Sequence, residues 1–152
     1  MRHIIALSVA LLGAAACDDT QPPPPWIELG SSASPTRFAP LDDGAEVPIT
    51  YGLQGGYHIW GALRGDHFDP DPVRMQFALY LDDQQIGGSD YSDHLIRPEP
   101  DGPYEYGGVT VFIYDNFPPE RIEGQTVRMT LTLTAGDVVL EDERTVIPRC
   151  CE

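Results

Sequence analysis

A histidine and a tryptophan two positions apart, His58 and Trp60, follow a pair of glycines in the segment 54–60, which reads QGGYHIW. The glycines can adopt positive φ angles and let a ligand or another backbone approach closely. Side chains alternate between the two faces of a strand, so His58 and Trp60 share one face. An imidazole there could bind a metal ion or a polar ligand beside the indole. In the alternative interpretation, it is a structural histidine bonded to the backbone. We predict a binding position at His58 and Trp60.

A second candidate is the acidic loop Asp66-His67-Phe68-Asp69-Pro70-Asp71, and Asp42-Asp43-Gly44 and Asp90-Tyr91-Ser92-Asp93-His94 are similar acidic loops. Closely spaced carboxylates and carbonyls on a loop can surround Ca²⁺, although this loop lacks the glycine and the terminal glutamate of an EF-hand. Asp and Pro also favour ordinary turns. Together with His58, the loop could instead form a transition-metal site. The predicted metal ligands are His58, Asp66, His67, Asp69 and Asp71. Without such a site, we expect no cofactor.

No catalytic signature accompanies these residues. The sequence contains no Gly-x-Ser-x-Gly turn, no phosphate-cradling glycine loop and no His-Glu-x-x-His segment. A pair of carboxylates for hydrolysis cannot be located in so acidic a chain. We therefore expect a protein that is not an enzyme, with a small secreted hydrolase as a second alternative. Aromatic residues near predicted loops and strand edges could form a sugar- or protein-binding face: Tyr91, Tyr104, Tyr106, Tyr114 and Phe117.

The N-terminal segment has the order of a secretory signal peptide. A short basic start with Arg2 is followed by the apolar run 4–12 and by small residues up to Ala16. The apolar run is shorter than the roughly 20 residues that cross a bilayer as a helix. Residues 1–16 are therefore predicted to be removed. The proline-rich stretch that ends at Pro25 predicts an extended spacer over 17–25.

Ala14-Ala15-Ala16-Cys17 resembles the bacterial lipobox, in which small residues precede a cysteine that is lipidated. The lipobox usually has leucine at the position of Ala14, and cleavage by an ordinary signal peptidase after Ala16 is the alternative. The resemblance implies lipidation of Cys17. The expected location is the cell envelope, on the outer or the inner membrane, or secretion if the alternative holds.

The charge of the chain excludes one class of partner. Without Arg2, eight arginines remain against 24 acidic residues, a formal charge of −16, and the chain contains no lysine. Phosphates would be repelled, so we expect no nucleic-acid partner. Of the three cysteines, Cys150 and Cys151 would remain as a pair if Cys17 carries lipid. Adjacent cysteines form only a strained disulfide, so the state of this pair stays open.

Strand patterns recur along residues 26–152. Val73–Leu81 and Thr126–Thr134 alternate apolar and polar side chains, as strands with one buried face do. The run 109–114 is apolar on both faces, as a central strand would be, and the segments around Ala135-Gly136-Asp137 and Asp82-Asp83 predict turns. Seven to nine short strands without a helix predict an all-β domain. In strand order, it resembles the immunoglobulin-like and fibronectin-type modules, which implies a single antiparallel β-sandwich.

The QGGYHIW segment, with the paired cysteines, also resembles bacterial lipoproteins that carry Gln-Gly-Gly-x-His-(Ile/Val)-Trp and have no established function. The resemblance implies an envelope location and no activity. We therefore predict an exported, membrane-anchored lipoprotein whose β-sandwich binds a protein or a glycan. The alternative is a periplasmic metal-binding protein that uses His58 and the acidic loops.

Lipidation at Cys17 can be tested directly. The substitution Cys17→Ser should release the protein from membranes and abolish its labelling by fatty acid, because the thiol is the attachment point. Membrane fractionation and labelling of cells that produce the full chain measure both effects. Unchanged membrane association of the variant would contradict the lipid anchor.

Overall fold

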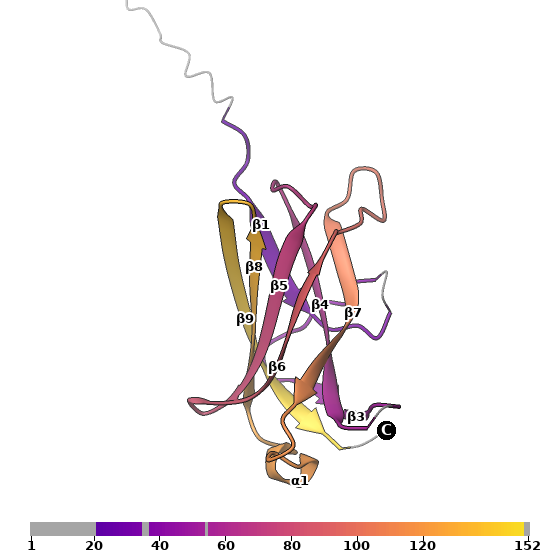
Figure 1. Cartoon of the computed structure of the whole chain (residues 1–152), viewed down its shortest axis with the longest axis vertical. Helices are drawn as coiled ribbons and strands as arrows, with labels where there is room; N and C mark the ends of the chain where they lie inside the picture. The colour runs from indigo at the N-terminus through magenta and orange to yellow at the C-terminus, as the bar shows by residue number, and fades with distance from the viewer. Residues whose placement is uncertain (1–20, 35–36, 54, 151–152) are drawn as a thin grey trace, which may run out of the picture.

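The computed structural model describes residues 21–34, 37–53 and 55–150, which form a sandwich of strands around one core (Figure 1). The strands are β1 Trp26–Gly30, β2 Ala45–Pro48, β3 Thr50–Tyr51, β4 Tyr57–Asp66, β5 Val73–Leu81, β6 Gln84–Asp93, β7 Tyr104–Ile113, β8 Val127–Ala135 and β9 Val138–Arg149, and the short helix is α1 Pro119–Ile122. The all-β prediction is confirmed.

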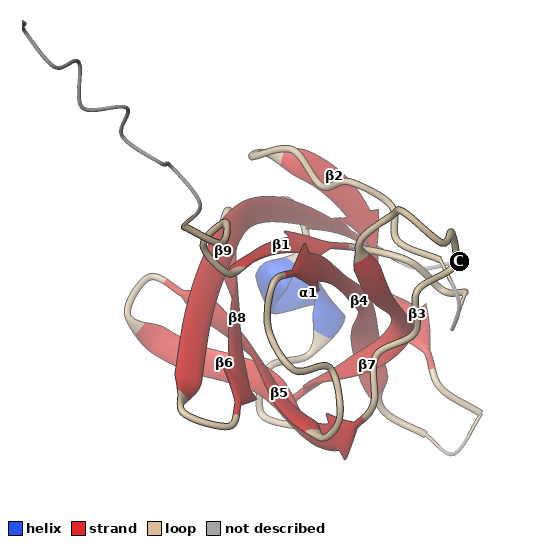
Figure 2. Cartoon of the chain, turned by 90° about the horizontal axis from the view of Figure 1, so that it is seen from above, coloured by secondary structure: helices blue, strands red, loops and turns tan. Residues whose placement is uncertain are grey.

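The strands form one sheet that folds back on itself, in the order β1-β4-β7-β6-β5-β8-β9-β2, with β3 beside β4. The two halves of this sheet face each other and surround the core, as the view from above shows (Figure 2). They are continuous only through β6 and β7, which pair at Gly87–Ile113 and Gly88–Phe112. A side chain at Gly87 would place its Cβ 2.3 Å from the carbonyl oxygen of Phe112, so glycine is required where the strands change sheets.

The core follows from the alternation of β5 and β8, whose inward side chains face the opposite sheet. Met75, Phe77 and Leu79 of β5 and Leu131 and Leu133 of β8 are all buried. Gly61 of β4 leaves room for Phe77, whose ring would lie 3.0 Å from a Cβ at that position. Apolar burial of this kind is the main favourable term in folding.

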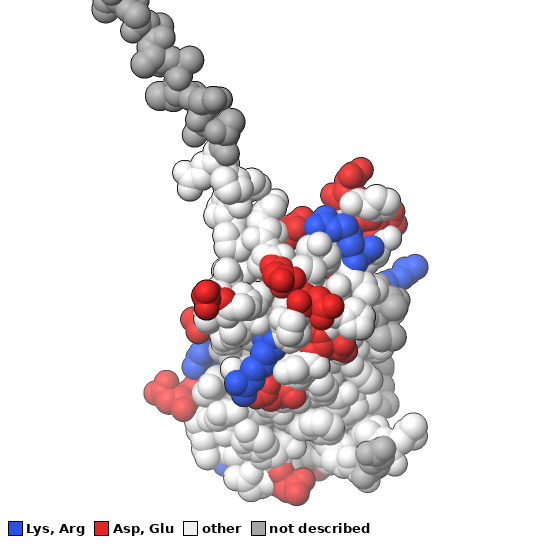
Figure 3. All heavy atoms as spheres, turned by 45° about the horizontal axis from the view of Figure 1, so that its top comes forward, with Lys and Arg blue, Asp and Glu red and all other residues white. Residues whose placement is uncertain are grey.

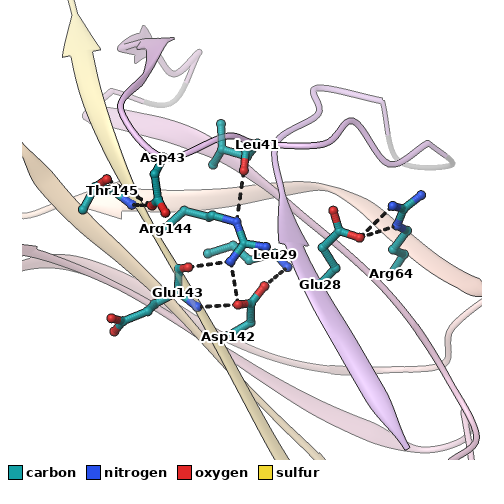
Figure 4. Close-up of polar contacts among 9 residues, drawn as sticks. All are labelled: Glu28, Leu29, Leu41, Asp43, Arg64, Asp142, Glu143, Arg144 and Thr145. Carbon is teal, nitrogen blue, oxygen red and sulfur yellow. Dashed lines mark hydrogen bonds and ion pairs between the residues drawn. The ribbon is translucent and has the colours of Figure 1, made fainter.

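On the side opposite the β6–β7 junction, a carboxylate joins the sheets. The Leu29 amide of β1 donates a hydrogen bond of 2.7 Å to Oδ2 of Asp142 on β9 (Figure 4). Arg144 Nη1 lies 2.6 Å from Oδ1 of Asp142, and Arg144 Nε donates to the Leu41 carbonyl oxygen at 3.0 Å. The Asp142 side chain therefore takes the place that a neighbouring strand would have along this edge of β1.

The structure corrects four details of the sequence prediction. β2 runs parallel to β9, so the sandwich is not wholly antiparallel. The predicted acidic loop around Asp90 belongs to β6, because pairing with β5 continues to the end of that strand. One turn of helix, α1, stands where no helix was expected. The outward side of β7 is half exposed at Phe112, not buried on both faces.

The N-terminal spacer joins one end of the sandwich. Trp26, the first residue of β1, pairs with Asp66 at the last residue of β4. Pro24 in the preceding spacer contacts His67 through its carbonyl oxygen, which lies 3.3 Å from Nδ1. The spacer therefore joins the end of the sandwich opposite to α1 and β3 (Figure 1). In the part of the chain that the structure describes, no helix is long and apolar enough to span a membrane.

The contacts of the Asp142 carboxylate with Leu29 and Arg144, which form the seam between the two halves of the sheet, predict that variants at position 142 lose stability to different extents. Asp142→Ala leaves the Leu29 amide without an acceptor and Arg144 without its ion-pair partner, so the free energy of unfolding should fall by about 2–3 kcal/mol. Asp142→Asn keeps an oxygen acceptor and should cost roughly half as much. Urea unfolding measures both.

The neighbouring Glu143 is a matched control, because its side chain is 63% exposed and pairs only with Arg128, at 3.3 Å. Glu143→Ala should change the free energy of unfolding by less than about 0.5 kcal/mol. Equal losses in the Ala variants at 142 and 143 would show that the seam does not hold the sheets together.

Candidate functional site

His58 is the one buried polar side chain among the described residues, with 4% of its surface exposed. Neither Nδ1 nor Nε2 has a hydrogen-bond partner. His58 lies on the outer face of β4, because the neighbouring Ile59 is part of the core. The sequence left open whether this histidine is bonded to backbone, and the structure shows that it is not. Most buried polar groups are satisfied, so this exception calls for a physical explanation.

Aromatic rings surround the imidazole. Trp60, two residues further along β4, meets the His58 ring edge-on, with centroids 4.6 Å apart. Phe112 of β7 is the cross-strand partner of His58, and its centroid lies 6.4 Å away. The prediction that His58 and Trp60 share a face is therefore correct. Phe112 joins them through strand pairing, which sequence spacing cannot indicate.

These rings form part of a hollow of about 390 Å³ on the outer face of β3, β4 and β7. Its walls are apolar at Trp60, Phe112, Tyr51 and Leu53, and its polar side chains are His58, Thr50 and Thr110. None of the described residues that line it is charged. Leu53 is fully exposed, Tyr51 is 61% exposed and Phe112 48%. A volume in this range and apolar walls with a few polar groups are typical of small-ligand sites.

The glycines of the QGGYHIW segment build the rim of the hollow. Gly55 and Gly56 have φ angles of 90° and 82°, which residues with a side chain rarely adopt. The turn closes through a 2.9 Å hydrogen bond from the Gly52 amide to the Gly56 carbonyl oxygen. A Cβ at Gly52 would lie 3.7 Å from His58 Nδ1, so the turn passes close to the imidazole. Gln54 lies outside the described residues.

Burial lowers the pKa of His58 from its ordinary value of 6.5, because the charged imidazolium loses its hydration there. The imidazole is therefore neutral at physiological pH, with one nitrogen as donor and the other as acceptor. Both functions are unused, which makes His58 suited to bind a ligand group that can both donate and accept.

The predicted metal ligands are not brought together. His58 stands near the start of β4, whereas Asp66 stands at its end and pairs with Arg97 at 2.9 Å. Arg97 holds the pKa of Asp66 below its usual value. Asp69 accepts a hydrogen bond from the Asp71 amide, as in an ordinary turn. Among the described residues, no group of three or more His, Cys, Asp or Glu side chains is placed to hold a metal ion.

The other acidic and aromatic candidates have structural roles. Asp43 accepts hydrogen bonds from the amide and hydroxyl of Thr145, which lower its pKa and fasten the turn before β2 to β9. Tyr106 donates to Asp93 at 2.8 Å, and burial raises the pKa of Tyr106 to about 12. Tyr91, Tyr104 and Tyr106 pack against the core, and Phe117 is buried in it. These four do not form an exposed face. Tyr114, the fifth candidate, is exposed, as are Tyr51 and Phe112 at the hollow, where Trp60 is partly buried.

Two larger hollows, of about 540 and 480 Å³, lie on the outer face of the other sheet and share Tyr80, Thr130 and Thr132. Several of their charged groups have partners: Arg128 lies 3.3 Å from Glu143 and over the Tyr80 ring, and Gln76 donates to Asp90. The smaller hollow at His58 is therefore the stronger candidate, because its polar atoms are unsatisfied.

Two cysteine predictions fall partly or wholly outside the described residues. Cys150, just after β9, takes part in a disulfide, and its amide donates to Glu123 at 3.2 Å. Cys151 lies outside the described part, as does the predicted lipidation residue Cys17.

The chain has a distant likeness to solved structures. No protein-family model and no curated protein matches the sequence. Among solved structures, an immunoglobulin-like protein from Pseudomonas aeruginosa is similar to the chain, with 18% sequence identity and a TM-score of 0.35 over 88% of this chain and 99% of that one. At this level of similarity, neither a fold family nor a site is transferred to this chain. The strands and their order confirm the all-β sandwich, and the immunoglobulin-like resemblance stays a prediction.

The unsatisfied imidazole predicts that its removal stabilises the protein. His58→Leu replaces two buried unpaired nitrogens by carbon at similar volume, so the free energy of unfolding should rise by about 1–2 kcal/mol. Thermal and urea unfolding measure the change. His94→Leu is the control, because His94 has an exposed side chain and should give a change below about 0.5 kcal/mol. A loss of stability in His58→Leu would mean that the imidazole has an unseen partner.

The lowered pKa of His58 predicts a pH dependence of the same variant pair. The unfolded chain takes up a proton near pH 6.5, whereas the folded protein resists it to a lower pH. Burial of the imidazole therefore has no pH-dependent cost above pH 6.5. As the pH drops from there toward the folded-state pKa, the folded protein loses stability by up to about 1.4 kcal/mol per unit. Between about pH 7.5 and 5.5, urea unfolding should show a larger loss in the wild type than in His58→Leu. Parallel pH curves would contradict this.

Proposed function

We propose that this chain is an exported, lipid-anchored module of the cell envelope that binds an envelope protein or glycan in the hollow at His58, without catalysis. One observation carries the proposal: a buried, neutral histidine with two unsatisfied nitrogens forms part of an exposed apolar hollow. Leaving such groups unpaired costs stability, typically about 1–3 kcal/mol per group. Retaining them is understandable if a ligand satisfies them, since function often lowers stability at a binding site.

The composition of the hollow favours binding over catalysis. Within the described part of the chain, its lining contains no carboxylate and no cysteine, and the imidazole nitrogens have no hydrogen-bond partner. General acid–base or nucleophilic catalysis needs such a group within hydrogen-bond reach of the histidine. Exposed aromatic side chains around a recess, by contrast, are the residues that contribute most to binding energy.

The position of the hollow suits a domain held by its N-terminal spacer. His58 and Asp66 are separated along β4 by eight residues, or about 26 Å at a rise of about 3.3 Å per residue. The spacer joins the Asp66 end, so an anchor at Cys17 would present the hollow on the half of the domain away from the membrane.

In this orientation, the charge of the domain leaves membrane attachment to the anchor. Acidic side chains are spread over the spacer end in Figure 3, and exposed residues there include Asp69, Asp71, Glu99, Asp101 and Asp137. Anionic headgroups would repel this end, so attraction to lipid would have to come from the anchor rather than from the surface of the domain. The same charge disfavours nucleic acid as the ligand.

Sedimentation with envelope material tests the proposal. The chain from residue 17 with Cys17→Ser should bind saturably to purified cell-wall sacculi or envelope membrane vesicles. Phe112→Ala removes one wall of the hollow and should weaken binding about tenfold, the effect of losing about 1.4 kcal/mol at an aromatic contact.

Tyr114→Ala is the matched control, because Tyr114 is 43% exposed, close to the 48% of Phe112, but does not line the hollow. Its binding should stay within about twofold of the parent, a difference below about 0.5 kcal/mol. Absence of saturable binding, or equal losses in the two variants, would reject the hollow as the binding site.

A further inference from the structure

We infer that the ligand of the His58 hollow is a neutral saccharide, whose ring stacks on the aromatic wall while a hydroxyl group hydrogen-bonds to His58. This inference rests on the proposed function and adds the chemical class of the ligand. It follows from three features of the hollow. Its described lining residues are uncharged, the strand at its floor has neighbouring strands on both sides, and aromatic rings lie beside a neutral imidazole without a hydrogen-bond partner.

The first feature is the absence of charge. Among the described residues, no Asp, Glu or Arg side chain lines the hollow, so a charged ligand group buried there would have no counter-charge from them. The net charge of −15 for the full chain disfavours an anionic ligand further. A metal cation would need a carboxylate or a second ligand beside His58, which the described lining residues do not supply. The ligand is therefore neutral where it enters the hollow.

The second feature is that the backbone around the hollow is already occupied. β4 is paired on one side with β1 and β3 and on the other with β7. The Trp60 carbonyl oxygen accepts a hydrogen bond from the Ser31 hydroxyl. The Thr110 carbonyl oxygen accepts from the hydroxyls of Ser89 and Tyr91. An extended peptide that binds by adding a strand needs a free sheet edge, and β4 has neighbouring strands on both sides.

The third feature is the pairing of aromatic rings with a neutral imidazole. Trp60 and Phe112 offer apolar faces next to His58, whose donor and acceptor are both unused. A purely apolar ligand would leave these nitrogens unpaired and sealed from water, which is unfavourable. A sugar hydroxyl can donate and accept, and the C–H face of the same ring packs on an aromatic side chain. A saccharide therefore satisfies both parts of the hollow at once.

A small movement of the rim is part of this inference, because both nitrogens are covered in the structure. β3 has only two residues and pairs only with β4, so Thr50 and Tyr51 are lightly held. Thr50 is the cross-strand partner of His58, so an outward shift of β3 would open the imidazole to a hydroxyl group.

The test uses the two tryptophans, Trp26 and Trp60, as built-in reporters. In the Cys17→Ser chain labelled with ¹⁵N-tryptophan, the two indole signals are assigned with Trp60→Phe. N,N′-diacetylchitobiose and maltose are added up to about 10 mM, a range that detects millimolar affinity. We expect at least one of the two disaccharides to shift the Trp60 signal saturably. The signal of Trp26, which lies in β1 opposite the last residue of β4, should stay unchanged. Glucuronic acid should shift neither.

Variants separate recognition from folding. His58→Leu, expected to fold more stably than the parent, should raise the dissociation constant for the disaccharide about tenfold or more, because the hydroxyl loses its partner. Phe112→Ala should do the same through lost stacking, and Tyr114→Ala should not. Unaltered affinity in His58→Leu would overturn the role assigned to the imidazole.

The outcome also distinguishes the inference from the proposed function. If neither disaccharide shifts Trp60 but the chain still sediments with envelope material in a Phe112-dependent way, the saccharide class is wrong and the binding function stands. If Phe112-dependent sedimentation is absent as well, both are wrong. A Trp60 shift that is equally strong with glucuronic acid would overturn the neutral-ligand argument.

Discussion

The structure depends on closing a single folded sheet along two unequal seams. On one side, β6 and β7 pair at two positions, where glycine allows the backbones to approach. On the other, the Asp142 carboxylate accepts the Leu29 amide and pairs with Arg144. An amide without a hydrogen-bond partner at a buried strand edge is unfavourable, so the Asp142 carboxylate supplies the acceptor that a neighbouring strand would otherwise provide. Once both seams are closed, the alternating apolar side chains of the strands share one core.

Closing the core determines what remains outside it. The inward side chains of β4 and β7, such as Ile59 and Val111, are committed to the core, which holds the alternate residues on the outer face. Because both strands are paired along their length, these outer residues form a flat, supported wall with little backbone available. Recognition at such a wall depends on side chains. The candidates for binding at this wall are therefore His58, whose ring nitrogens lack hydrogen-bond partners, and the neighbouring rings of Trp60 and Phe112.

The two ends of the domain differ in charge. The spacer end carries acidic loops, with Asp66, Arg97 and Tyr104 linked by an ion pair and by stacking of the guanidinium on the ring, 4.1 Å from its centroid. These contacts satisfy the charges locally and hold the loops. The opposite end carries the uncharged hollow and the short strand β3. A binding site without charge is thus kept apart from a surface that repels anions.

The strands and the tight turns could be predicted from the order of the amino acids, because alternation and turn chemistry act over a few neighbouring residues. Val73–Leu81 forms β5 as predicted, Gly136 lies in the hairpin before β9, and His58 and Trp60 share a face. Other features could be read only from the folded domain. Phe112 lies opposite His58, and the imidazole has no hydrogen-bond partner. Asp66 and His67 lie at the other end of β4 from His58. The tertiary structure also extended β6 through residues that resembled a loop and made β2 parallel to β9. The physical reason is that these features arise from pairing between strands distant in the chain, whose register depends on the packing of the whole core and leaves no local pattern in the sequence.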